Sequence, residues 1–360
     1  MTRGCSPFLV VALLFACKPA PVRPPQDTDT EEEAMIRAPG PVERAQALLQ
    51  AGRPEEALAV FEEAIAGSPG DHELHYGRGV VLQTLGRGDD AVAAWREALA
   101  LRPGFFPALN GIGAVELDAG RFTAAIEAFT AAIEARPDFA DARYNLGLAY
   151  EGVGRAEEAL ASLREAQRLA PQDYDVYIAQ AGLLLRLGRA QDAKVAASAA
   201  LERRPGDLEA SRSIGLALAR LGEHEAAAVA FKPVVEARPE DHDTRLALAR
   251  ALSRAGQAEA ALIHLERLAV ALPEEAQVWS ELGAALAKLG RLDGPSGALA
   301  RLERSITLDP KLASAHVRKI AALAEGKRCK EAKAALRSFS AGDPREDARK
   351  QAEAALGDCR

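Results

Sequence analysis

The sequence has few aromatic residues and lacks the alternating runs of Val, Ile and Thr that predict strands. Aromatic residues make up 5% of the 360 residues, whereas hydrophobic residues as a group make up 48%. Ala and Leu dominate that group, and both are strong helix formers that pack closely. The composition therefore favours an all-α protein with a substantial core.

The sequence also has no excess of positively charged residues over negatively charged ones. Lys and Arg number 45 against 52 Asp and Glu, which gives a formal net charge of −7. Proteins contact nucleic acid through clustered Lys and Arg, because these residues neutralise phosphates. Nucleic acid is therefore not an expected partner.

The usual motifs of enzyme and metal sites are absent from the sequence. It has no Gly-x-Ser-x-Gly nucleophile elbow, and the Gly-x-Gly pairs at 77–79 and 111–113 lack the third glycine of a dinucleotide fingerprint. His72 and His75 have a spacing that suits a metal on one helix, but the nearby carboxylates do not complete a recognisable ligand set. We predict no enzymatic activity, no cofactor and no metal site.

The apolar run closest to the N-terminus, Phe8–Ala16, is much shorter than the about 20 residues that span a bilayer. Arg3 precedes it and Cys17 follows it, as in the apolar region of a secretory signal. Leu14–Cys17 resembles the bacterial lipobox, with Phe15 as a departure from its pattern. This resemblance implies a signal peptide over 1–16, a lipid on Cys17 and, because Lys18 follows, an outer-membrane lipoprotein facing the periplasm or the cell surface. The alternative is an ordinary signal peptide cleaved nearby.

Residues 17–41 differ in composition from the rest of the chain. Lys18–Pro25 is rich in proline, and Asp27–Glu33 is acidic with nothing to bury. Such segments stay extended or disordered in water. We therefore predict a tether over 17–41 between the lipid and the folded part.

A repeat of 34 residues organises the rest of the chain. Prolines mark it, with one longer interval of 37 residues before the eighth: Pro69, Pro103, Pro137, Pro171, Pro205, Pro239, Pro273, Pro310 and Pro344. An alanine stands twelve residues before each proline, at Ala57, Ala91, Ala125, Ala159, Ala193, Ala227, Ala261, Ala298 and Ala332. A mostly bulky apolar residue stands eight before it, and usually a glycine seventeen before it. Each repeat predicts two helices around a glycine turn, and stacking on neighbours buries the apolar faces.

This pattern resembles the tetratricopeptide repeat. The resemblance implies an all-α superhelical solenoid of about nine helix-turn-helix repeats over 42–346, followed by a capping helix over 347–360. The first repeat has a first helix shortened by Pro39–Pro41, and the eighth has a turn lengthened around 293–297.

The cysteines fit an exported protein, in which disulfides persist. Removal of the signal peptide would also remove Cys5, and Cys17 would carry lipid, which leaves Cys329 and Cys359. In the repeat register Cys329 falls in the turn of the ninth repeat and Cys359 at the end of the capping helix. We predict a disulfide between them, with two free thiols as the alternative.

In tetratricopeptide arrays the first helix of each repeat lines the concave face, where partner peptides usually lie. The resemblance places there, from repeats two to four, Tyr76, Asn110, Tyr144 and Leu148, and from repeats five to seven Arg186, Arg212, Arg220, Arg250 and Arg254. Arg186, Arg220 and Arg254 occupy a position where Lys or Arg is common in this repeat, so a purely structural role is the alternative for them. Because an Arg guanidinium can donate two hydrogen bonds to one carboxylate, an acidic protein or peptide partner is expected.

Two functions remain from different classes. The first is a non-catalytic scaffold or assembly factor tethered to the outer membrane, as in the similar pilotin-like lipoproteins. The second is a cell-wall or polysaccharide-associated envelope factor. Glycan sites favour exposed aromatic platforms, which are scarce here, so protein binding is the better supported of the two.

Overall fold

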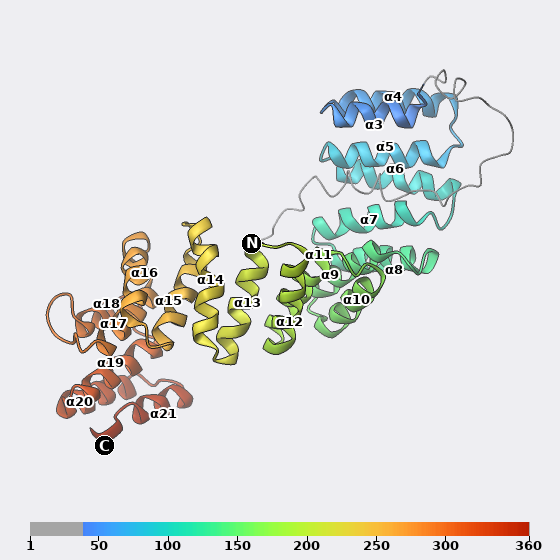
Figure 1. The fold of residues 1–360 in the computed structure, drawn as a ribbon. Coiled ribbons are helices and arrows are strands. Elements are labelled where there is room, and N and C mark those ends of the chain that lie inside the picture. Colours follow the sequence, from blue (N-terminus) through green and yellow to red (C-terminus); the bar gives the residue numbers. More distant parts are fainter. Residues whose placement is uncertain (1–38, 360) are drawn as a thin grey trace. The chain divides into compact units, whose positions relative to one another are not determined.

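The computed structural model describes residues 39–359, and the predicted lipidation site Cys17 lies outside them. The described part is all-helical and contains no strand (Figure 1). The helices of the first four repeats are α3 (Pro41–Gln50), α4 (Pro54–Gly67), α5 (His72–Thr84), α6 (Gly88–Leu101), α7 (Phe106–Asp118), α8 (Phe122–Ala135), α9 (Ala140–Gly152) and α10 (Ala156–Leu169). The next are α11 (Tyr174–Arg186), α12 (Ala190–Arg203), α13 (Leu208–Leu221), α14 (His224–Ala237), α15 (His242–Arg254) and α16 (Ala258–Ala271). The last described elements are α17 (Ala276–Lys288), α18 (Ala298–Leu308), α19 (Ala313–Glu325), α20 (Cys329–Ala341), α21 (Glu346–Ala354) and the 3₁₀ turn η1 (Gly357–Cys359).

These elements form nine successive helix pairs, which confirms the predicted solenoid of tetratricopeptide type. The first helix of the first repeat, α3, is short at 10 residues, against 14 in its partner α4. In the eighth repeat α17 ends at Lys288 and α18 begins only at Ala298, as expected from the extra residues there.

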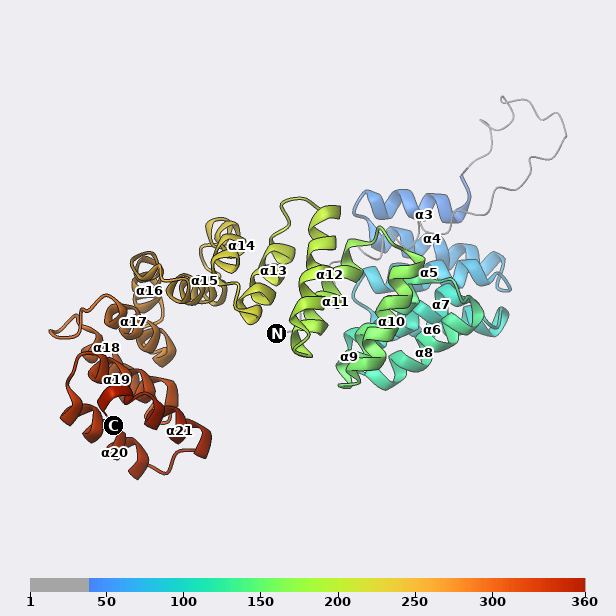
Figure 2. The same cartoon turned by 60° about the horizontal axis from the view of Figure 1, so that its bottom comes forward.

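The chain divides into two compact bodies, an N-terminal body that ends at Ala179 and a C-terminal body that begins at Gln180. In the N-terminal body each helix pair packs on the next through the contacts α4–α5, α6–α7 and α8–α9. In the C-terminal body the corresponding contacts are α12–α13, α14–α15, α16–α17 and α18–α19, and the stacked pairs are seen from a second side in Figure 2. No described helix has the length and apolar character to cross a membrane.

The residues that define the repeat also define the core. All nine alanines twelve residues before the prolines are completely buried. Eight residues before the proline lie the large buried side chains, among them Trp95, Phe129, Phe231 and Leu302. A Cβ atom on Gly147 would stand 2.8 Å from Leu163 Cγ and 3.2 Å from the Ala159 carbonyl oxygen. The small residues therefore allow the two helices of a repeat to approach closely.

A second recurring contact was not predicted from the sequence. In five repeats the side chain six residues after the proline bonds back to that proline's carbonyl oxygen: His75 Nε2 to Pro69 at 2.9 Å, Arg143 to Pro137 at 3.2 Å, Tyr177 to Pro171 at 3.0 Å, Trp279 to Pro273 at 2.8 Å and His316 Nε2 to Pro310 at 2.9 Å. The contact satisfies a carbonyl at the start of the loop between repeats. We refer to this residue as the loop staple.

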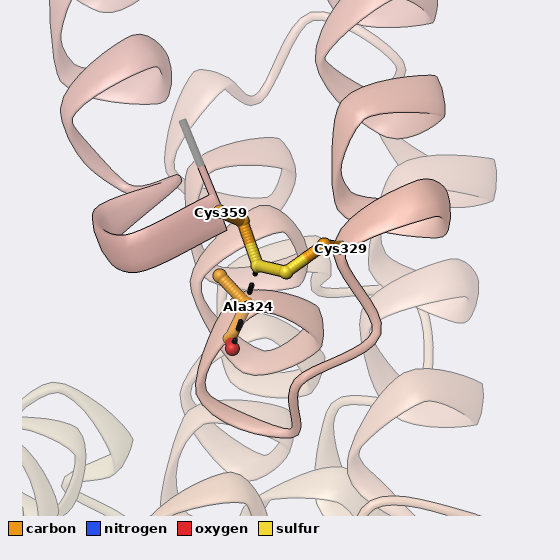
Figure 3. Close-up of a disulfide and its surroundings, with 3 residues drawn as sticks. All are labelled: Ala324, Cys329 and Cys359. Carbon is orange, nitrogen blue, oxygen red and sulfur yellow. Dashed lines mark hydrogen bonds between the residues drawn. A yellow bond between two sulfur atoms is a disulfide. The ribbon is translucent and has the colours of Figure 1, made fainter.

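The C-terminal end is covered by α21 and η1, which pack on α19 and α20. Cys329, at the start of α20, and Cys359, in η1, are joined by a disulfide with Cα atoms 5.0 Å apart (Figure 3). Cys359 is almost completely buried, and its sulfur lies 3.8 Å from the Ala324 carbonyl oxygen of α19. The bond therefore ties the end of the chain to the last repeat.

Candidate functional site

The first helices of the later repeats lie beside one another in the C-terminal body. α13 contacts α15, α15 contacts α17, and α17 contacts α19. Side chains at the same register on these helices therefore form rows across neighbouring repeats, which is the condition for a partner to bind several repeats at once.

One hollow on this face has a volume of about 270 Å³ and is lined by α15, α17 and α19. Its charged lining residues are Arg250, Arg254, Lys288, Arg318, Glu281 and Glu325, and alanines of α17 and α19 supply the small apolar part. We call it the basic pocket, because four cationic side chains face two carboxylates.

Two of the four cations are held by the buried carboxylate. Glu281 is 9% exposed, and its Oε1 accepts a hydrogen bond from Arg250 Nε at 2.6 Å and one from Arg318 Nη2 at 2.8 Å. Arg318 Nη1 also donates to Ser280 Oγ at 2.7 Å, and Arg250 Nη2 donates to Gln277 Oε1 at 3.0 Å. Glu281 thus fixes both guanidinium groups and neutralises part of their charge.

Lys288 has a structural role. Its Nζ donates to the Ser253 carbonyl oxygen of α15 at 2.5 Å, and Arg220, at the same register position two repeats earlier, donates in the same way to the Leu185 carbonyl oxygen. These contacts satisfy carbonyl groups at the C-terminal end of the preceding first helix, where cations also favour the helix dipole. At Arg220 and Lys288 the residue at this register position therefore has a purely structural role, which is the alternative to partner binding.

Arg254 occupies the same register position but behaves differently. It is exposed, lines the basic pocket and makes no hydrogen bond or ion pair within residues 39–359. Its guanidinium is therefore the cation of the pocket that is available to a ligand. Arg186, another predicted site residue, is exposed on α11.

Arg212 is engaged inside the C-terminal body. Its Nε donates to Thr244 Oγ1 at 3.0 Å, and the Thr244 hydroxyl donates to Asp241 Oδ2 at 2.6 Å. Burial alone would raise the pKa of Asp241, but the Thr244 hydrogen bonds and the nearby Arg212 and Arg238 hold it below its usual value. Arg212 therefore belongs to a network that caps α15.

The predicted site residues of the N-terminal body lie partly in its packing. Asn110 is buried, and its Oδ1 accepts a hydrogen bond from Asn145 Nδ2 at 3.3 Å. Tyr76 is half-buried and makes an edge-to-face contact with Phe105, with ring centroids 5.3 Å apart. Tyr144 and Leu148 are half-buried on α9. Their assignment to a partner-binding surface stays a prediction.

An acidic group accompanies these residues. Burial and, next, the neighbouring charge of Asp173 raise the pKa of Asp141 on α9 above its ordinary value. Among residues 39–359 no group of three or more His, Cys, Asp or Glu is placed to hold a metal ion. His75, which has a metal-binding spacing with His72 in the sequence, bonds Glu97 Oε2 at 2.8 Å through Nδ1.

Sequence reasoning missed Glu281 and Arg318. A signal was present, because both stand eight residues after their proline, so that opposite charges share one register position in neighbouring repeats. In a stacked array such a pair lies on adjacent first helices, which allows a direct ion pair.

Comparisons with known proteins agree with the geometry. Family models described as tetratricopeptide repeat match residues 42–104, 111–174, 178–242 and 218–293, more than half of the chain. No curated protein matches it.

Several solved structures are similar to this chain. MamA residues 41–end from Desulfovibrio magneticus RS-1 is 31% identical, with a TM-score of 0.40 over 44% of this chain and 89% of that one. YrrB, described as a tetratricopeptide repeat protein with an unusual peptide-binding site, is 22% identical, with a TM-score of 0.46 over 51% of this chain and 95% of that one. PilF of Pseudomonas aeruginosa is 18% identical, with a TM-score of 0.50 over 56% of this chain and 92% of that one, a likeness of fold alone.

Proposed function

Because the chain belongs to the tetratricopeptide repeat family, we propose that it is a scaffold that binds protein partners on the first helices of its repeats. We place a partner contact at the basic pocket, and we propose an acidic peptide segment as its ligand. Arg254 is the observation that carries this assignment, since it is exposed and unpaired within the described residues while its neighbours are fixed by Glu281 and by backbone carbonyls.

The geometry suits a carboxylate better than a cation or an apolar side chain. Arg250 and Arg318 retain N–H groups around the buried Glu281, and Arg254 contributes a full guanidinium fork at the rim. A carboxylate between them would gain charge-assisted hydrogen bonds worth about 1.5 to 3 kcal/mol each. Glu325, also in the lining, would disfavour a ligand with acidic groups on every side.

The test is binding of a synthetic peptide of alternating Ala and Glu, measured by fluorescence anisotropy against the purified protein. Arg254→Glu should weaken binding by roughly tenfold or more, because it replaces an attractive charge with a repulsive one. Arg337→Glu, on the exposed surface of α20, makes the same change in net charge outside the pocket and is the matched control.

Equal weakening by both variants, or by neither, would exclude the basic pocket as the acidic-peptide site. Arg212→Glu and Arg250→Glu are less informative, because both side chains already hold internal hydrogen bonds whose loss would disturb the array. The physiological partner can then be sought by cross-linked pull-down from native envelopes, with wild type and Arg254→Glu side by side.

We also propose that Cys17 carries lipid and that the tether of residues 17–41 holds the array at the bacterial outer membrane. Support comes from the apolar run Phe8–Ala16 and the lipobox-like Leu14–Cys17. Cys17→Ser should abolish incorporation of labelled palmitate and move the protein from the membrane to the soluble fraction. Retention of label and of membrane association in the variant would disprove lipidation at this residue.

Glycan binding remains the second candidate, and the two tryptophans do not favour it. Trp95 is buried, and Trp279 is half-buried, with its Nε1 bonded to Pro273 and its face covered by Arg301 at 5.2 Å. A sugar-stacking platform needs an open aromatic face.

A further inference from the structure

Arg245 of α15 is a buried arginine with no protein partner among residues 39–359. It is 8% exposed, it forms no hydrogen bond or ion pair there, and its Nε is buried without an acceptor. Burying a guanidinium N–H group without an acceptor is costly, so buried charged groups are normally paired. An anion bound beside Arg245 would satisfy this buried N–H group.

The repeat register defines what surrounds Arg245. It is the residue six after Pro239, the position of the loop staple, yet it makes no bond to that proline. In the second repeat this position is His75, whose Nδ1 bonds Glu97 Oε2 of α6 at 2.8 Å. The residue in the place of Glu97 in the seventh repeat is Arg267 of α16. Two arginines thus occupy the positions of a histidine–glutamate pair.

A third basic group faces the same place. His264 stands nine residues before its proline, and in the eighth repeat the corresponding Arg301 lies over the ring of the staple residue Trp279 at 5.2 Å. By the same register His264 faces Arg245, and the His264 Nδ1 is buried without a hydrogen bond. Burial first, and then the charges of Arg245 and Arg267, lower the pKa of His264.

The carboxylates closest in sequence do not neutralise this group. Glu240, Asp243 and Glu266 are exposed, and none of them pairs with Arg245 or Arg267 within the described part of the chain. His242, one turn before Arg245 on α15, adds another buried Nδ1 that lacks a partner. Both helices that form the cluster, α15 and α16, therefore contribute basic residues to it.

We propose that Arg245, His264 and Arg267 form a binding site for an oxyanion of the phosphate type. Arg245 of α15 and His264 of α16 supply buried N–H groups, and Arg267 adds an exposed guanidinium three residues after His264 on α16. A tetrahedral oxyanion offers enough acceptor oxygens for all three, whereas a carboxylate offers two. The site is on different residues from the basic pocket and is independent of the proposed peptide binding. The phosphate can be free in solution or part of a phospholipid headgroup.

The experiment uses inorganic phosphate as the probe, with binding to the purified protein measured by calorimetry in a phosphate-free buffer. Arg267→Glu restores the acidic residue found at this position in the second repeat and supplies an internal carboxylate. It should weaken phosphate binding roughly tenfold or more, because it both removes a donor and fills the site. Lys232→Glu on the exposed face of α14 changes the net charge equally and should leave binding unchanged.

Two further measurements separate a local site from a general charge effect. Phosphate should raise the pKa of His264, followed by NMR of the ring in wild type, because a bound anion offsets the charges of Arg245 and Arg267. Arg245→Gln provides a second variant with no added negative charge, and it should weaken phosphate binding as Arg267→Glu does. Circular dichroism checks that both variants are folded.

Vesicles of phosphatidylglycerol distinguish the two sources. If a headgroup is the ligand, wild type should sediment with the vesicles and Arg267→Glu should not; if free phosphate is the ligand, only the calorimetric binding should depend on the cluster. Absence of saturable binding in both arms would overturn the proposal. It would also be overturned by phosphate binding that is equal in wild type and in both cluster variants.

Discussion

The alanine twelve residues before each repeat proline is the residue on which close helix packing depends. Ala159 on α10 is completely buried, and its carbonyl oxygen would be 3.2 Å from a Cβ atom on Gly147. The backbones of α9 and α10 therefore approach so closely at this point that no longer side chain fits between them. Ala161, two residues further on, is exposed on the same helix.

This contrast makes a prediction with an internal control. Ala159→Leu should lower the free energy of unfolding by about 1 to 3 kcal/mol, because added methyl groups force the two helices apart. Ala161→Leu should change it by no more than about 0.5 kcal/mol, as is usual for surface substitutions. Urea denaturation followed by circular dichroism measures both, and equal effects of the two variants would contradict the packing argument.

Charged residues show the limit of what the sequence predicts at this scale. The register placed Arg212, Arg250 and Arg254 on first helices, and the structure has all three there. Their roles differ, because Arg212 bonds Thr244, Arg250 bonds Glu281, and only Arg254 is left exposed and unpaired in the described part. The partner of a long side chain lies in the neighbouring repeat. Which partner it contacts depends on how the repeats stack, and this cannot be predicted from the sequence of one repeat.

At the scale of helices the sequence was sufficient for most elements. The proline spacing, the alanines and the turn glycines predicted nine helix pairs, the short α3 and the long connection between α17 and α18, because each depends on local geometry repeated nine times. The loop staple was missed, since His75, Arg143, Tyr177 and Trp279 differ in type and share only a position and a hydrogen bond.

The disulfide makes a prediction for the last elements. Cys329 and Cys359 are 30 residues apart, and closing a loop of that length restricts the unfolded chain by roughly 3 to 4 kcal/mol. Reduction, or a Cys329→Ser/Cys359→Ser variant, should therefore loosen α21 and η1 first. Limited proteolysis should cut the C-terminal end faster, while α13–α17 stay protected.

Intact-mass measurement after alkylation, with and without reductant, shows whether the thiols are paired in protein isolated from the cell envelope. Two free thiols in that sample would exclude the bond. Unchanged proteolysis after reduction would instead mean that the packing of α21 on α19 is enough to hold the cap.

For the whole molecule, stability is distributed along the array. Within each body the helix pairs pack on their neighbours, and the buried clusters group residues of neighbouring repeats, as in the set around Phe129 and Leu146 and the larger set around Phe231 and Leu265. In such proteins the free energy of unfolding approximates a sum of repeat and neighbour terms. A local defect is therefore expected to stay local.

Two cavity-forming substitutions test this directly. Phe129→Ala on α8 and Phe231→Ala on α14 each remove a completely buried ring and should cost about 3 to 5 kcal/mol locally. Hydrogen exchange followed by mass spectrometry should show faster exchange in α7–α10 for the first variant and in α13–α16 for the second. Each variant should leave the other's region at the wild-type rate, because no described core cluster contains both rings. If either substitution instead accelerated exchange uniformly from α3 to α21, the array would unfold as one cooperative block, and the proposed binding surface at α15, α17 and α19 would depend on every repeat.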